Sequence, residues 1–213
     1  KIRNTCRFLL GNLYDFDACI GNMEQKGKEL FGVRFKIHES DHELITRLLV
    51  YILRDVENAE KLNLSLQKGI LLSGPVGCGK TSLMTLIRFF QPRDNRFIMK
   101  SCRDVSFEFI QEGYAVILKY SRNSFNKEIP LMYCFDDLGT ENNLKYFGNE
   151  CNLMAEIILS RYDKFISHKM ITHMTTNLNS SEIESLYGIR VRSRMREMYN
   201  LISFEKEAKD KRM

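Results

Sequence analysis

Apolar residues follow two alternating patterns along this chain. Residues 41–56 and 151–165 carry apolar side chains three or four positions apart, which is the spacing of a helix that buries one face. Helices are also expected at 80–90, across most of 105–120, and as two short segments after residue 175. Short, strongly apolar runs typical of buried strands occur at 69–73, 96–100, 131–135, 170–175 and 201–204. Apolar strands that alternate with helices predict an α/β fold, with a parallel sheet covered on both faces.

Length and composition add the domain organisation. The chain has 213 residues, 44% of them hydrophobic and 28% charged, which suits one globular domain. Residues 1–39 show weak periodicity, so we expect an N-terminal arm there and the main domain over 40–213. No apolar run reaches the roughly 18 residues of a membrane span, and no signal peptide opens the chain. The six cysteines include no C-x-x-C pair, so we expect reduced thiols and a cytoplasmic protein without a membrane partner.

Charge is concentrated at the C-terminal end. Residues 188–213 contain eight Lys or Arg and four Asp or Glu, a net +4 out of the +5 of the whole chain. Such a segment suggests an anionic partner, although a basic surface exposed only to solvent would show the same charge pattern.

One apparent metal motif is rejected. Residues 38–42 read His-Glu-Ser-Asp-His and match H-E-x-x-H, a pattern that binds zinc when both histidines share one helix face. Ser40 and Glu43 form a capping-box pattern that would start the helix after Ser40. His38 would then lie outside the helix, away from the face of His42.

The strongest motif is a phosphate-binding loop. Residues 74–81 fit G-x-x-x-x-G-K-[ST] completely, between a predicted strand and a predicted helix. Glycines let backbone N–H groups converge on phosphate oxygens, and the helix N-terminus adds its positive end. Lys80 would reach the β- and γ-phosphates, and the Thr81 hydroxyl would bind Mg²⁺. The predicted nucleotide-binding residues of this segment are Gly74, Pro75, Val76, Gly77, Cys78, Gly79, Lys80, Thr81 and Ser82.

A second anchor for magnesium follows the strand at 131–135. Asp136 at its tip would hold the Mg²⁺ water shell, and Asp137 would orient or deprotonate the attacking water. Two acids after a strand are often only a turn or a helix cap. Together with the upstream loop, however, they predict a site for a nucleoside triphosphate, with ATP and Mg²⁺ as cofactors.

With these motifs in place, the chain resembles the AAA+ ATPases of the DnaC/DnaI helicase-loader type and the related IstB transposition helpers. The resemblance covers about residues 65–213 and rests on residues 74–81, 135–141, 158–162, 175–178 and 187–195. It implies a three-layer αβα core with a five-stranded parallel sheet, so that the main domain is an AAA+ ATPase domain. Almost nothing follows Arg212, so the C-terminal lid of a full AAA+ module would be reduced or absent.

The resemblance also implies roles for single residues. Asn177 takes the sensor position at the tip of the strand beside the acids, where its amide can hydrogen-bond the lytic water or the γ-phosphate. Arg194 takes the position of an arginine finger that reaches the nucleotide of a neighbouring subunit, with Arg190 in support. Arg212 would contact the nucleotide in its own subunit. Asp137 replaces the commoner Glu and is one methylene shorter, so hydrolysis is expected to be slow or switch-like.

Three functions remain open on these grounds. The leading interpretation is an ATPase of DNA replication that forms homo-oligomers on ATP and helps load a replicative helicase, and a transposition helper is a close variant. An adaptor that uses ATP as a switch with little turnover is the main alternative, and a P-loop kinase is a remote one. Members of the family bind single-stranded DNA through the segment between the second and third strands. That segment here contains basic and aromatic residues that suit this contact, or that form core and wet surface: Arg103, Phe107, Phe109, Tyr114, Lys119, Tyr120, Arg122 and Lys127.

Overall fold

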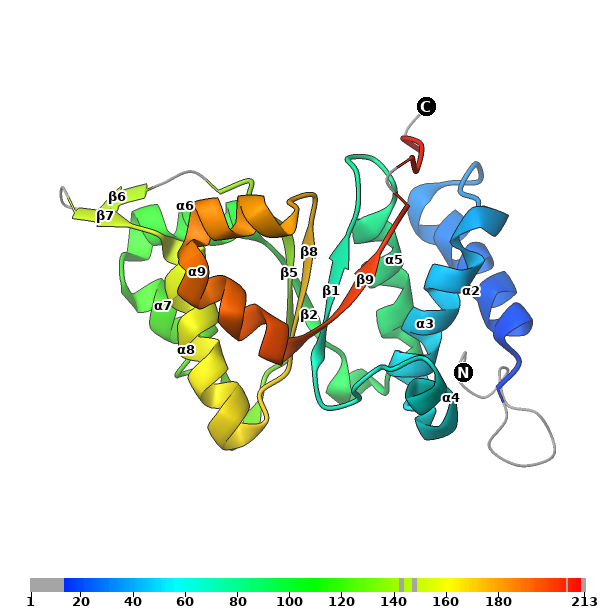
Figure 1. Cartoon of the computed structure of the whole chain (residues 1–213), viewed down its shortest axis with the longest axis horizontal. Coiled ribbons are helices and arrows are strands. Elements are labelled where there is room, and N and C mark those ends of the chain that lie inside the picture. The colour runs from blue at the N-terminus through cyan, green and yellow to red at the C-terminus, as the bar shows by residue number, and fades with distance from the viewer. Residues whose placement is uncertain (1–13, 142–143, 147–148, 206, 212–213) are drawn as a thin grey trace.

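The computed structural model describes residues 14–141, 144–146, 149–205 and 207–211. Its centre is a five-stranded sheet in the order β2-β5-β8-β1-β9, in which every neighbouring pair is parallel (Figure 1). The predicted parallel α/β fold is therefore confirmed, and each predicted strand is present within a few residues. The strands are β1 Gly69–Ser73, β2 Ile98–Ser101, β5 Tyr133–Leu138, β8 Thr172–Thr176 and β9 Tyr199–Ser203. Two short antiparallel pairs lie outside this sheet: β3 Phe125–Asn126 with β4 Ile129–Pro130, and β6 Leu144–Tyr146 with β7 Asn149–Cys151.

Helices cover both faces of the sheet (Figure 1). One layer holds α2 Phe16–Phe31, α3 His42–Leu53, α4 Val56–Lys61 and α5 Lys80–Ile87, and the other holds α6 Cys102–Glu112, α7 Ala115–Tyr120, α8 Leu153–His168 and α9 Ser180–Met198. Strand β1 shows why its run is apolar throughout: Ile70 and Leu72 belong to the core under the first layer, and Leu71 to the core under the second. Successive side chains of a strand point to opposite faces, so a sheet buried on both sides needs apolar residues at every position.

Helix α2 is an element that the hydrophobic pattern did not predict. It packs against α3 and α5, and Cys19, Ile20 and Met23 are buried in the core of the first layer. Its apolar stripe is narrow, and charged residues on the other positions, such as the Lys28–Glu24 pair, dilute the pattern. Residues 16–31 thus contribute to the same core as the phosphate-binding loop's helix.

The start of α3 differs from the prediction. A 3₁₀ turn occupies Glu39–Asp41, Asp41 stands at the N-cap position, and no side chain caps the helix, so the predicted capping box is wrong. The Asp41 carboxylate instead forms an ion pair with Lys211. His38 is extended and precedes the turn, and the described residues contain no group of three His, Cys, Asp or Glu side chains that could hold a metal. His38 therefore lies outside the helix that begins at His42, as expected.

Strand β5 is longer than predicted and irregular. It continues through both acids to Leu138, and its register with β8 shifts between Phe135 and Leu138. Asp137 sits at this irregularity with a φ of 58°, in the left-handed region that is uncommon outside glycine. The acids therefore lie within the end of the strand rather than beyond it.

Helix α9 consists of two helical segments that meet at Gly188, as the two short helices expected there require. Gly188 has φ 86° and ψ 159°, far from helical values. Beyond it, Val191, Met195 and Met198 are buried in the core of the second layer, as their spacing indicates. No helix within the described ranges is long and apolar enough to span a bilayer.

Candidate nucleotide site

The phosphate-binding loop joins the carboxyl end of β1 to the start of α5. Gly77 and Gly79 have φ values of 79° and 104°, which only glycine adopts without strain. Gly79 is the N-cap of α5 and, as a glycine, gives the helix no side-chain cap. The N-terminus of α5 therefore begins directly at the end of the glycine loop, which is the arrangement that binds anions at a helix N-terminus.

Lys80 is folded into this loop. Its Nζ donates hydrogen bonds to the carbonyl oxygens of Gly74 and Pro75, each at 2.8 Å, and the residue is only 6% exposed. The carbonyl groups of Gly74 and Pro75 thus hold the ammonium group inside the phosphate-binding loop. A phosphate group in the loop would meet a buried positive charge.

Asp136 connects the loop to two neighbouring strands. Its carboxylate accepts hydrogen bonds from Thr81 Oγ1 at 2.9 and 3.1 Å and from Thr175 Oγ1 at 2.7 Å. Burial raises the pKa of Asp136, while the bonds from Thr175 and Thr81 oppose that rise. Hydroxyl and carboxylate oxygens that converge within 3 Å are the hard donors that Mg²⁺ prefers, so Thr81 and Asp136 fit a magnesium ion.

Thr175 is the residue of this site that the sequence did not indicate. Besides its bond to Asp136, its Oγ1 accepts a hydrogen bond from the backbone N–H of Asp137 at 2.9 Å. One hydroxyl therefore positions both acids. In this stretch the sequence assigned a role only to Asn177, and the next helix is capped by Asn179, in a capping box with Glu182. The available signal was the number of polar residues in this predicted strand, since four of the five residues of β8 are polar and all five are buried.

Asp137 and Asn177 lie on the same open cleft as the loop. The cleft has a volume of about 1530 Å³, and its wall includes Lys80, Thr81, Asp137 and Asn177. Residues 31, 34–38 and several of 40–47 form another part of the wall, as do residues 201–205 and 207–211. The structure thus brings together the predicted residues of the loop, the acid and the amide from three different strand ends.

The C-terminal segment lies across the loop. The backbone N–H of Lys211 donates to the Gly77 carbonyl at 3.0 Å, and a Cβ on Gly77 would collide with the Asp210 carboxylate. Lys211 Nζ forms the ion pair with Asp41 at the start of α3. Arg212, predicted to contact the nucleotide, lies outside the described residues, and among residues 204–205 and 207–211 no helix follows β9.

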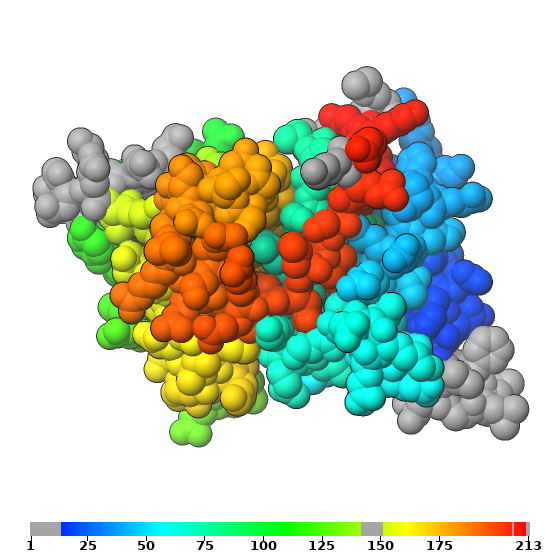
Figure 2. All heavy atoms as spheres, viewed as in Figure 1, coloured from blue at the N-terminus to red at the C-terminus, as the bar shows by residue number. Residues whose placement is uncertain are grey.

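Arg194 is not part of this cleft. Its guanidinium lies 4.3 Å from the ring centroid of Tyr162 on α8, and it donates to the Tyr162 hydroxyl at 3.0 Å and to Glu197 at 3.1 Å. Arg190 is exposed, whereas Arg192 bonds to Ser180 and pairs with Glu184. The second half of α9 lies on the surface in Figure 2.

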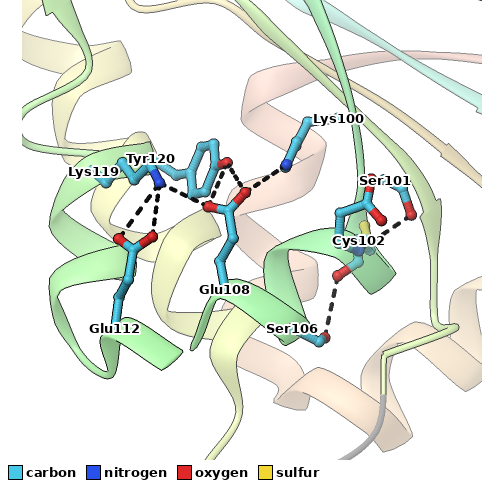
Figure 3. A network of polar contacts seen from close by, with 9 residues as sticks. Lys100, Ser101, Cys102, Ser106, Glu108, Glu112, Lys119 and Tyr120 are labelled. Atoms are coloured by element: carbon cyan, nitrogen blue, oxygen red, sulfur yellow. Dashed lines mark hydrogen bonds and ion pairs between the residues drawn. The ribbon is translucent and has the colours of Figure 1, made fainter. Parts of the chain in front are cut away.

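The segment between β2 and β5 divides into core and surface. Phe109 and Tyr120 are buried, whereas Phe107 and Tyr114 are 51% and 47% exposed, and Arg103 lies over the Phe107 ring. Figure 3 shows that Lys119 is engaged with Glu108 and Glu112, and that Glu108 also binds Lys100 at 2.5 Å. Lys119 is therefore paired with two carboxylates, and Arg103, Arg122 and Lys127 are further exposed cations of the predicted DNA-contact segment.

The network of Figure 3 predicts an acid-sensitive contribution to stability. Burial alone would raise the pKa of Glu108, but hydrogen bonds from Lys100, Lys119 and Tyr120 lower it from 4.5 to about 2. A carboxylate with a depressed pKa stabilises the fold above pH 4.5 and loses that contribution as the pH falls toward 2. Glu108→Gln should therefore lower the free energy of unfolding by about 1–2 kcal/mol at pH 7 and by much less near pH 2.

Urea unfolding across this pH range measures the difference. Glu57→Gln, on an exposed ion pair, is the control, and equal pH profiles for Glu108→Gln and the wild type would contradict the prediction.

The sheet order, the phosphate-binding loop on β1 and the acids at the end of β5 define a P-loop protein with the AAA+ fold. Comparison with solved structures agrees. The DnaC helicase loader superimposes with a TM-score of 0.54 at 19% identity, over 81% of this chain and 94% of that chain. A protein from Streptococcus pyogenes described as a primosome component also gives 0.54, at 15% identity over 81% and 83% of the two chains. The resemblance to DnaC-type loaders is thereby confirmed for the fold.

Sequence comparisons add little to this assignment. No protein-family profile matches the chain. Among curated proteins, ABC transporter B family member 1 of Arabidopsis thaliana is 31% identical over 122 residues. That match covers 53% of this chain, and the chain spans 8% of the transporter's length. The likeness is local and carries no function over.

Proposed function

We propose that this protein is an ATP-hydrolysing AAA+ protein of DNA replication, similar in role to a helicase loader. The observation that carries the proposal is the bonded set of Thr81, Asp136 and Thr175 beside a complete phosphate-binding loop. A loop alone could bind any anion, whereas a hydroxyl and a carboxylate that converge at its mouth suit the Mg²⁺ complex of a nucleoside triphosphate. The solved structures with which this chain shares its fold include proteins described as a helicase loader and a primosome component.

The residues of the cleft suggest a division of labour. The loop N–H groups and Lys80 would bind the β- and γ-phosphates, and Thr81 and Asp136 would hold Mg²⁺, which neutralises phosphate charge when it is bound. Asp137 would orient or deprotonate the attacking water. Asn177, across the same cleft, would donate a hydrogen bond to the water or to the γ-phosphate.

Partners belong to the same proposal. Arg194 lies outside its own cleft, so a homo-oligomer formed on ATP would let it reach the nucleotide of the next subunit. Single-stranded DNA would stack on Phe107 and Tyr114 beside Arg103, and a replicative helicase in the cytoplasm would be the protein partner. An adaptor that switches with little turnover is the second candidate. It is favoured by Asp137, whose side chain is shorter than Glu and whose backbone is in the left-handed region.

Lys80→Ala tests whether the phosphate-binding loop binds ATP. Removing the buried ammonium should weaken binding of a fluorescent ATP analogue by about 100-fold, the factor that corresponds to about 3 kcal/mol for a charged hydrogen bond. Phosphate release should be lost with it. Lys61→Ala, on an exposed helix position, is the matched control and should bind and hydrolyse like the wild type. A wild-type protein that binds no nucleotide, or a Lys80→Ala variant that binds normally, would sink the proposal, while binding without phosphate release would favour the adaptor.

A further inference from the structure

The loop that follows Asp137 is closed by its own contacts. The Asp137 carbonyl accepts hydrogen bonds from Thr140 Oγ1 at 2.7 Å and from the Thr140 N–H at 3.2 Å. Glu141 turns back into this loop, and its Oε2 accepts from the Gly139 N–H at 2.9 Å. Gly139 itself has a φ of 103° and lies against the Leu178 side chain. Thr140 and Glu141 therefore both bond to the backbone of residues 137–139, the loop that carries Asp137.

The other carboxylate oxygen of Glu141 leaves the loop. Its Oε1 accepts a short hydrogen bond from the hydroxyl of Tyr187, which lies on α9, 46 positions further along the chain. Both residues are partly buried, and burial raises the pKa of Glu141. A charge-assisted bond shielded from water is stronger than a neutral exposed one. This bond joins the loop of residues 137–141 to α9.

Tyr187 directly precedes the break in α9. A Cβ placed on Gly188 would meet nothing within 4 Å, so no neighbouring atom encloses the break itself. Polar contacts lie on both sides of it: Tyr187 bonds to Glu141 before the break, and Arg192 bonds to Ser180 and Glu184 across it. Arg190 and Arg194 lie on the segment that starts at this break.

We propose that Glu141 and Tyr187 are positioning residues that connect the Asp137 loop to the break at Gly188, so that occupation of the phosphate site changes the placement of Arg190 and Arg194. The inference rests on the proposed function, because it needs a nucleotide at Asp137 and a neighbouring copy of this chain at Arg194. It assigns a role to two residues outside the nucleotide cleft. It also explains why the acidic strand is followed by a glutamate that bonds to a distant tyrosine.

Amide hydrogen exchange tests the connection without requiring turnover. In the wild type, a non-hydrolysable ATP analogue should protect residues 74–83 and change the exchange of residues 186–194. Tyr187→Phe removes only the hydroxyl, and Glu141→Gln keeps the shape but removes the charge. Both variants should keep the protection at 74–83 and lose most of the change at 186–194. Tyr14→Phe and Glu57→Gln, remote from the cleft, should respond as the wild type does.

Steady-state kinetics gives a second test, because a loss of stability alone would not lower kcat while KM stays unchanged. Each variant should lower kcat for ATP about tenfold with KM unchanged within about twofold, because placement rather than binding is lost. The double variant should be no slower than the slower single variant, since both changes break one link. Variants that retain the nucleotide response at 186–194 and the wild-type kcat would overturn the inference while leaving the proposed function intact. A wild type without protection at 74–83 would remove the proposed function and this inference together.

Discussion

Arg194→Ala should reduce ATP hydrolysis by about 10³-fold while nucleotide affinity stays at the wild-type value. The guanidinium lies on α9, outside the cleft that contains Lys80, Thr81 and Asp137, so its loss leaves the binding groups of its own subunit in place. The expected effect is on the charge that develops in the transition state at a neighbour's γ-phosphate. Phosphate release and binding of a fluorescent ATP analogue measure the two effects separately.

A mixing experiment tests whether the arginine acts between subunits. Arg194→Ala has an intact phosphate site without the finger, and Lys80→Ala has the finger without an intact phosphate site. When the two inactive variants are mixed, measurable ATP hydrolysis should return. In the wild type alone, the hydrolysis rate per protomer should rise with protein concentration. Arg196→Ala, exposed on the same helix, should hydrolyse normally. Full activity of Arg194→Ala alone, or no recovery on mixing, would show that the finger assignment is wrong.

Arg161→Leu should lower the free energy of unfolding by about 3–5 kcal/mol. The Arg161 side chain is completely buried on α8, where burial lowers its pKa to about 10, so it remains charged at neutral pH. Its Nε, Nη1 and Nη2 atoms donate to two hydroxyls and three backbone carbonyls. These acceptors are Thr172 Oγ1, Ser124 Oγ and the carbonyls of Tyr120, Leu131 and Ile171.

The loss is large because the acceptors would remain buried after their donors are removed. Leucine fills part of the space but leaves the three carbonyls without a partner, at a cost of about 1–3 kcal/mol for each. The midpoint of urea unfolding at a constant m-value measures the change. Arg161→Lys should retain part of the stability, because an ammonium group has three donors instead of five. A midpoint for Arg161→Leu equal to that of the wild type would contradict this account.

The sequence by itself determined the fold class and the phosphate-binding loop. Both depend on residues that are adjacent along the chain: the apolar runs of the strands and the glycines, lysine and threonine of residues 74–81. It also indicated Asp136 and Asp137, because a strand end is a local feature. Its local cues failed at the start of α3, where a 3₁₀ turn places Asp41 rather than the predicted Ser40 at the N-cap, and the Asp41 carboxylate pairs with the distant Lys211.

Only the tertiary structure decided how distant residues act together. Thr175 bonds to Asp136 across 39 positions, Arg161 to the Tyr120 carbonyl across 41, and Tyr187 to Glu141 across 46. The order of strands in the sheet brings these partners together, and periodicity along one segment carries no information about that order. The same holds for Arg194, whose distance from its own cleft depends on where α9 packs. Motifs close in sequence are therefore predictable here, whereas the contacts that position them depend on which strand ends and helices become neighbours in the folded chain.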